Sequence, residues 1–282
     1  MKKQDIYKIL GKYFDNYQIS QILQKQTGLS KSQLFLCKSI DTINEWSLHT
    51  LISQWEEKYP FEYIIQKAEF YWFEFFVDER VLIPRNDTEI MVEQAIKSIN
   101  SSKNTVNYLD IWTWSSCIHI SVINNVNNEK IKQNFVIDIS SEALEVSKIN
   151  IEAYNLSNKV TQLHGDLFTP AKEVINSDDL IITANLPYIK NNDYENMDNE
   201  TLQFEPDLAL YGWKETWFEL YEVLIDQLIQ TKEINHINNI TLFIEIWFDQ
   251  EKYSQKYLNS LWLHFELFKD NGWIIRCIKV KI

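Results

Sequence analysis

Glycine is scarce in this sequence. The chain holds only 5 glycines among its 282 residues, whereas average usage of about 7% would give roughly 20. Tryptophan, by contrast, occurs 10 times. Because glycine is the residue that adopts left-handed backbone conformations without strain, so little of it in a chain with many turns requires a specific explanation.

Clusters of cysteine and histidine are also absent, which argues against two kinds of site. Cys37, Cys117 and Cys277 lie far apart and form no C-x-x-C pair, so the sequence predicts neither a disulfide framework nor a zinc site. His119 and His164 have no carboxylate or cysteine at ligand spacing. We interpret both as core or surface residues and expect no metal site.

Positive charge and long apolar runs are lacking as well. Lysine and arginine number 27 against 40 acidic residues, a net charge of -13, which repels phosphate backbones and anionic lipid. No stretch approaches the roughly 18 apolar residues of a membrane span, and the first residues, MKKQDIYKILGKYF, lack the apolar core of a signal peptide. We therefore expect a cytoplasmic protein with neither a membrane nor a nucleic acid as direct partner.

The pattern of apolar residues divides the chain into three parts. Residues 1–67 carry apolar residues at helical spacing, which predicts a small helical domain. Residues 68–84 contain two runs of aromatic and β-branched residues, which predict a linking β-hairpin. In residues 85–282, short apolar strands alternate with amphipathic helices, and this alternation predicts an α/β fold with a mostly parallel, doubly wound sheet.

Polar residues stand where the predicted strands end. Asp110, Asp138 and Asn185 close three strands, and in an open α/β sheet such ends face one crevice. Asp138 lies 24 residues after Trp114, close to the spacing of about 20 at which an acid reaches a ribose hydroxyl. A helix cap is the alternative for Asp138. Asp166 follows a further strand and either meets a base edge or only shapes a turn.

The segment NLPY, residues 185 to 188, is more informative. The Asn185 side-chain oxygen and the Leu186 carbonyl can each accept one N–H of a planar NH2 group, while Pro187 stiffens the turn and Tyr188 flanks the group. This arrangement would leave the lone pair of the bound nitrogen aimed at an electrophile. A proline-containing turn capped by asparagine is the alternative reading.

Six segments carry distinctive motifs: FYWFEFFVDERVLIPRNDTE, YLDIWTWSSCIHI, NLPYI, FEPDLALYGWKETWFELYEVLI, LFIEIWFDQ and DNGWIIR. Together they resemble one known family, the glutamine methyltransferases that modify peptide chain release factors. The match covers most of residues 60 to 282 in the family's order. It implies a class I (Rossmann-like) S-adenosylmethionine-dependent methyltransferase with a mostly parallel seven-stranded sheet, and a helical N-terminal domain that docks the substrate.

The resemblance also implies roles for residues. The donor S-adenosylmethionine would lie against the loop after the first strand, with Asp138 on its ribose. The implied cofactor-binding residues are Asp110, Trp112, Thr113, Trp114, Ser115, Asp138, Asp166, Leu167 and Asn185. The implied catalytic residues are Asn185, Leu186, Pro187 and Tyr188. The partner would be a glutamine-containing loop of a release factor in translation termination, bound by a monomeric enzyme.

Two alternatives stay open. NLPY, with Leu186 in second place, also resembles the ribosomal RNA adenine dimethylases, which would make the chain an N6-adenine methyltransferase of RNA or DNA. The net charge of -13 and the EPDLALYG segment favour glutamine instead. If Trp112 and Trp114 are genuine, the donor's space would be filled, and the chain would be a non-catalytic binding protein.

Tryptophan replaces glycine at several positions of the family's motifs. These positions are Trp72, Trp112, Trp114, Trp213, Trp217, Trp247 and Trp273. Glycine serves there because it reaches positive φ or lets a ligand touch the backbone. We hypothesise that these codons are UGA, decoded as glycine by the source organism and written as tryptophan by the translation table used.

Overall fold

The centre of the molecule is a seven-stranded sheet with the order β5-β4-β3-β6-β7-β9-β8. The computed structural model describes residues 1–175, 178–187, 202–206 and 218–282. The strands are β3 (Val106–Ile111), β4 (Ile131–Asp138), β5 (Val160–His164), β6 (Asp179–Ala184), β7 (Ile240–Glu245), β8 (His264–Lys269) and β9 (Ile275–Lys281). Neighbours from β5 to β7 are parallel, and β9 runs antiparallel to β7 and β8. The predicted mostly parallel sheet is thus confirmed.

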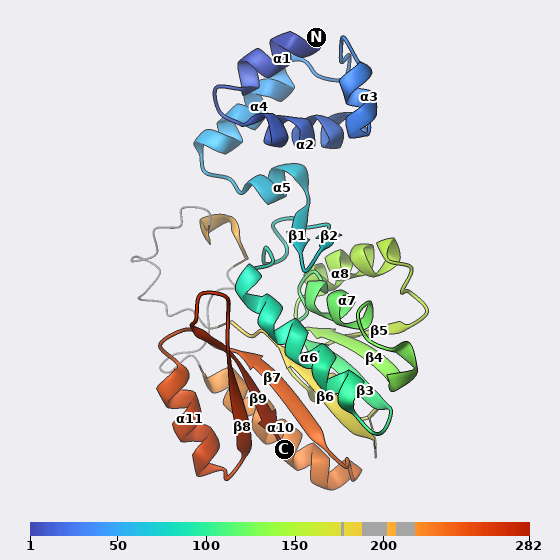
Figure 1. The fold of residues 1–282 in the computed structure, drawn as a ribbon, viewed down its shortest axis with the longest axis vertical. Coiled ribbons are helices and arrows are strands. Elements are labelled where there is room, and N and C mark those ends of the chain that lie inside the picture. The colour runs from blue at the N-terminus through green and yellow to red at the C-terminus, as the bar shows by residue number, and fades with distance from the viewer. Residues whose placement is uncertain (176–177, 188–201, 207–217) are drawn as a thin grey trace.

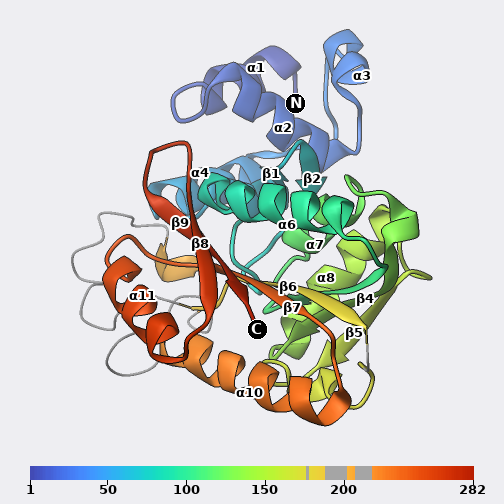
Figure 2. The same ribbon diagram turned by 60° about the horizontal axis from the view of Figure 1, so that its bottom comes forward.

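The central strands are apolar throughout because helices cover both faces of the sheet. Every residue of β3 and of β7 is buried. On one face lie α6 (Glu89–Ser101) and α7 (Cys117–Ile123), and on the other lie α10 (Glu219–Asn235) and α11 (Glu251–Ser260). Figure 2 shows α6 and α10 on opposite sides of the strands, and α8 (Ser141–Ala153) connects β4 to β5.

The N-terminal helices form a core of their own, built from residues of the first 65 positions. The helices are α1 (Lys3–Leu10), α2 (Asn16–Thr27), α3 (Lys31–Leu36), α4 (Glu45–Glu56) and α5 (Phe61–Ile65). Capping boxes at Asp15, Ser30 and Asn44 begin α2, α3 and α4, and each satisfies backbone N–H groups that a helix start leaves unpaired. In Figure 1 these helices stand beyond one end of the sheet.

The predicted hairpin forms, but it is shorter than residues 68–84. Strands β1 (Ala68–Phe70) and β2 (Phe73–Phe75) pair antiparallel across a two-residue turn. At Phe76 the pairing ends because the Asn150 side chain takes over both backbone groups, accepting from the N–H at 2.7 Å and donating to the carbonyl at 2.9 Å. Residues 76–84 contain no strand. The boundaries 1–67, 68–84 and 85–282 remain predictions.

None of the helices in the described residues is both long and apolar enough to span a membrane.

Truncating a side chain in the central sheet should be costly. Ile182 of β6 is fully buried, so Ile182→Ala should lower the free energy of unfolding by about 2–5 kcal/mol, because it leaves a cavity among close-packed neighbours. Chemical denaturation measures the loss. The matched control, Ile234→Ala on the exposed side of α10, should change stability by no more than about 0.5 kcal/mol. Equal losses in both variants would contradict the described core.

Candidate active site

Asp110 is the penultimate residue of β3, the strand at which the strand order reverses. Its carboxylate is fully buried and accepts hydrogen bonds from the Thr113 hydroxyl at 2.6 Å and the Thr183 hydroxyl at 2.7 Å. Thr183 is its register partner on β6. Burial raises the pKa of Asp110 to about 7, although both hydroxyls oppose that rise. In a doubly wound sheet, a reversal of this kind is where ligands bind.

Asp138 closes β4, the next strand, and holds the loop that follows β3. Its carboxylate accepts the backbone N–H of Trp114 at 3.0 Å and that of Ser140 at 2.9 Å. The helix cap of α8 is Ser140, whose hydroxyl accepts from the Ala143 N–H. Asp138 is therefore not that cap, the alternative left open by the sequence. Burial raises the pKa of Asp138 to about 6 despite the hydrogen bonds to backbone N–H groups.

The loop between β3 and α7 folds back over the end of β4. The N–H groups of Trp112 and Thr113 both donate to the Ile137 carbonyl, at 2.8 and 3.1 Å. The Ser115 carbonyl accepts from the Asn150 side chain at 2.9 Å. Such a curl requires left-handed backbone, and φ is 64° at Trp112 and 49° at Trp114. This loop brings Asp110, Thr113 and Ser115 together with the two tryptophans.

The two indoles fill the crevice beside these polar groups. Trp112 and Trp114 are 4% and 5% exposed, and their rings lie 6.3 Å apart at 53°. Neither Nε1–H has a partner among the described residues. A buried donor left unpaired in this way costs about 1–3 kcal/mol. Two such donors side by side indicate that this crevice is not shaped for indoles.

The cavity that described residues form beside these groups is too small for a nucleotide-sized molecule. A cavity lined by Thr113, Trp114, Arg85 and Asn185 holds about 10 Å³, close to the space of a single water. Sites for ligands of drug size measure roughly 300–1,000 Å³. The carboxylates of Asp110 and Asp138 and the Asn185 amide are polar groups that suit S-adenosylmethionine. The two tryptophan side chains do not, because they fill the space that this cofactor would need.

Asn185 directly follows β6 and lies beside this loop. It is 6% exposed and lines the same small cavity as Thr113 and Trp114. Leu186 and Pro187 follow it and are buried. The Leu186 N–H donates to the Tyr221 hydroxyl at 3.0 Å, and that hydroxyl donates to the Glu245 carbonyl at 2.6 Å. Tyr188 lies outside the described residues.

Asp166 and Leu167 lie in the loop after β5. The Gly165 N–H donates to the Asp138 carbonyl at 3.0 Å, which brings this loop beside the end of β4. Asp166 is exposed, whereas Leu167 is 1% exposed and belongs to the core under the sheet. Of the two, Asp166 is the one free to meet a base edge.

Sequence reasoning assigned no role to three residues that hold the site together. Tyr221 from α10 fixes the backbone of Leu186, as described above. Glu205 has a fully buried side chain and contacts Arg85 through both carboxylate oxygens at 2.8 Å. Burial raises the pKa of Glu205, and the Arg85 guanidinium opposes that rise. Glu205 and Tyr221 both lie in the FEPDLALYGWKETWFELYEVLI segment, so the motif itself was the available signal.

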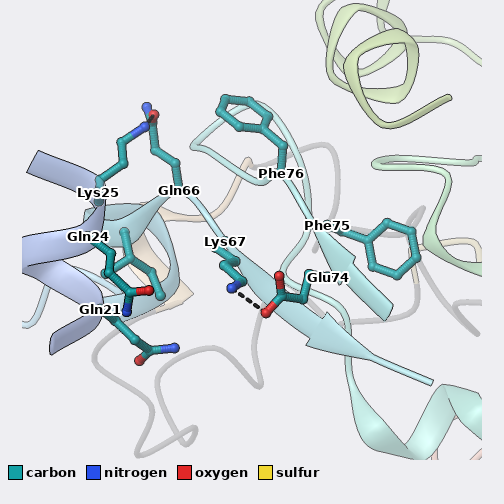
Figure 3. A pocket seen from close by; sticks show the side chains of 9 residues that line it. Gln21, Gln24, Lys25, Gln66, Lys67, Glu74, Phe75 and Phe76 are labelled. Carbon is teal, nitrogen blue, oxygen red and sulfur yellow. Dashed lines mark hydrogen bonds and ion pairs between the residues drawn. The ribbon is translucent and has the colours of Figure 1, made fainter. Parts of the chain in front are cut away.

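Two larger cavities that the described residues form lie near the hairpin. One of about 340 Å³ is lined by α2 residues, including Gln21 and Lys25, and by the start of the hairpin. Figure 3 shows these polar side chains around it, with the ion pair between Lys67 and Glu74. Its lining includes none of the strand-end carboxylates or the Asn185 amide, so it is not the candidate active site.

Comparison with solved structures agrees with this architecture. The catalytic domain of hMettl16 superimposes with a TM-score of 0.54 and 13% identity, covering 73% of this chain and 74% of that chain. A human methyltransferase 10 domain containing protein gives a TM-score of 0.50 with 16% identity, covering 73% of this chain and 87% of that one. The fold is that of the class I S-adenosylmethionine-dependent methyltransferases.

Sequence comparison is more specific. Release factor glutamine methyltransferases from Flavobacterium psychrophilum and Clostridium botulinum are each 31% identical, covering 84% and 94% of this chain and 82% and 88% of theirs. The same enzyme from Thermodesulfovibrio yellowstonii is 33% identical over 88% of this chain and 85% of its own. No family model matches the chain. Because these relatives are at least 31% identical over most of both chains, the chain belongs to the release factor glutamine methyltransferase family.

The buried carboxyl of Asp138 predicts a pH dependence of stability. Its pKa is raised by burial, so the neutral form favours the fold, and this contribution is complete below the ordinary value near 4 and lost as pH rises through about 6. Asp138→Asn stays neutral. Between pH 4 and 8 the parent chain should lose roughly 3 kcal/mol more than this variant.

Urea unfolding at each pH measures the difference. Glu142→Gln, which replaces an exposed carboxyl on α8, should follow the parent profile. Parallel profiles for the parent and Asp138→Asn would show that Asp138 does not titrate as described.

Proposed function

We propose that this chain transfers a methyl group from S-adenosylmethionine to the side-chain amide nitrogen of a glutamine in a peptide chain release factor. The main supporting observation is that Asn185 and Leu186 directly follow β6 and that Asn185 lies against the loop after β3. Family membership supports the same reaction, because the relatives bear that name. We extend the proposal to a cytoplasmic enzyme that acts as a monomer.

The contribution of the chain itself is orientation of the acceptor. An amide nitrogen is a poor nucleophile, so holding it in line with its reaction partner is the main means of acceleration. In our proposal the Asn185 side-chain oxygen accepts one N–H of the substrate amide and the Leu186 carbonyl accepts the other. Tyr221 supports this arrangement, because its hydroxyl links the Leu186 N–H to the Glu245 carbonyl.

Electrostatic character favours a protein substrate over a nucleic acid. The net charge of -13 repels a phosphate backbone. Leu186 in NLPY is the one feature that favours the second candidate, an adenine N6 position. Both substrates present a planar NH2 group, so the same pair of acceptors could hold either, and the assay below includes both.

The assay uses the chain carrying Trp112→Gly and Trp114→Gly, because the two indoles occupy the crevice. Incubated with a release factor and S-adenosylmethionine, it should add one methyl group to a glutamine, detected by peptide mass. Adding Asn185→Ala should slow the transfer by about 100-fold or more, since the amide loses its orientation. The melting temperature of each variant is recorded alongside.

Two controls sharpen this prediction. Asn239→Ala removes an exposed asparagine at the start of β7, bonded to Asp179, and should leave the rate unchanged. A release factor with the modified glutamine replaced by alanine should accept no methyl group. Methylation of RNA, with none of the release factor, would transfer the assignment to the adenine candidate.

A further inference from the structure

Five tryptophans adopt a backbone conformation that favours glycine. The φ angles are 69° at Trp72, 64° at Trp112, 49° at Trp114, 57° at Trp262 and 64° at Trp273. Only a few per cent of non-glycine residues have positive φ, and bulky ones are outliers there. Yet tryptophan accounts for five of the 12 such residues in the described part of the chain. A cause specific to these tryptophans is therefore required.

Trp72 occupies the glycine position of a tight hairpin turn. Phe70 pairs with Phe73, so Tyr71 and Trp72 are the two central residues, with φ of 47° and 69°. Positive φ at both positions defines a type I′ turn, for which Asn-Gly is the preferred pair. The indole of Trp72 is 97% exposed and hence gains little from packing in return.

Trp262 occupies the glycine position of a helix end. It follows Leu261, the C-cap of α11. The Leu263 N–H donates to the Leu258 carbonyl, and the Trp262 N–H donates to the Asn259 carbonyl, both at 3.1 Å. This pair of bonds is the Schellman motif, whose left-handed residue is usually glycine. Elsewhere in the chain, Gly28 ends α2 with φ of 70°.

Trp273 occupies the glycine position of a second hairpin. Between β8 and β9, the Asp270 N–H donates to the Ile274 carbonyl at 2.9 Å and the Trp273 N–H donates to the Asp270 carbonyl at 3.1 Å. These bonds enclose a three-residue loop that ends in a left-handed residue, the position of the glycine in a G1 bulge. Trp273 is 80% exposed.

The described tryptophans outside this group have no positive φ. Trp46 and Trp55 lie in α4, and Trp55 packs 4.8 Å from the Phe14 ring. Trp247, a glycine position in the family's motif, has no positive φ, and its ring lies 4.8 Å from the Arg276 guanidinium carbon. Backbone geometry thus adds Trp262 and gives no support for Trp247. Two further motif positions, Trp213 and Trp217, lie outside the described residues.

We propose that positions 72, 112, 114, 262 and 273 are glycine in the polypeptide that the source cell makes, each encoded by UGA. Three of them are identified by turn type alone, without reference to any relative. At positions 112 and 114, glycine removes both indoles with their unpaired Nε1–H groups and opens the crevice beside Asp110 and Asp138 for the methyl donor. This last part rests on the proposed function, whereas the residue identities do not.

Tryptic peptides of the protein purified from its source cells test the identities directly. Peptides 257–269 and 270–276 each contain one of the five positions, and peptide 68–80 contains a third. We expect the mass of glycine at each of the three. Peptide 39–58 is the internal control, because it carries Trp46 and Trp55 and should keep both indoles. The gene should read UGA at the five codons and UGG at these two. Tryptophan at positions 262 and 273 would overturn the proposal.

Stability of recombinant protein gives a second test that needs no activity. The left-handed conformation costs an L-residue roughly 1–2 kcal/mol, so Trp72→Gly, Trp262→Gly and Trp273→Gly should each raise the melting temperature by about 2 °C or more. The three turns are separate, so the gains should add. Trp46→Gly also removes an exposed indole, but from a helix, where glycine is unfavourable, and this control should not raise the melting temperature. A lower melting temperature in all four variants would contradict the turn assignments.

Binding of S-adenosylhomocysteine tests whether glycine at positions 112 and 114 opens the crevice to the cofactor. By calorimetry with S-adenosylhomocysteine, the chain with Trp112→Gly and Trp114→Gly should bind, and the chain with both tryptophans should not. Equal binding by both chains would overturn the steric part of the proposal. Failure of the glycine chain to methylate a release factor, despite donor binding and glycine-containing peptides, would instead refute the proposed function and leave this inference intact.

Discussion

The carbonyl end of β4 is the element on which the candidate active site depends. The Ile137 carbonyl accepts hydrogen bonds from the N–H groups of Trp112 and Thr113. The Asp138 carboxylate accepts one from the Trp114 N–H, and its backbone carbonyl accepts one from the Gly165 N–H. The end of this one strand therefore holds two loops in position. Because β3 lies between β4 and β6 in parallel register, the loop after β3 meets Asn185 at the point where the strand order reverses.

Burial at this point has an electrostatic consequence. Asp110 and Asp138 are both removed from water, and burial raises the pKa of each into the range of 6 to 7. Backbone N–H groups and hydroxyls hold them in place, but they do not supply a compensating cation. Carboxyl oxygens accept hydrogen bonds, so a ligand with hydroxyl groups suits this site. A ribose with its hydroxyls is a ligand of that type, which agrees with the predicted place of the donor.

Much of the fold could be predicted because the signals are local. The alternation of apolar strands with helices follows from the pattern of side chains, and β3 to β9 all lie in residues 85–282, where that alternation was predicted. The hairpin was less predictable. Its residues 76–84 read as strand, but Asn150, from a helix distant in sequence, takes the hydrogen bonds of Phe76, and only tertiary contacts determine such competition.

The site divides in the same way. The polar residues at strand ends could be located from the sequence, since strand ends carry the ligand groups of an α/β sheet. Leu167 stays a predicted cofactor-binding position, and its side chain is buried in the core. Nothing in the pattern of residues alone could reveal that Tyr221 reaches across from α10 to Leu186. Long-range hydrogen bonds of this kind depend on how helices pack.

The sequence by itself determined the class of fold, the strand-end residues, and the improbable pairing of few glycines with many tryptophans. It did so because periodicity and composition are properties of the chain alone. Only the tertiary structure decided which tryptophans stand in left-handed backbone, since φ is set by turns whose closing hydrogen bonds join separate residues. The backbone angles therefore add Trp262, which ends a helix in a Schellman motif, to the positions proposed as glycine. They give no support for Trp247.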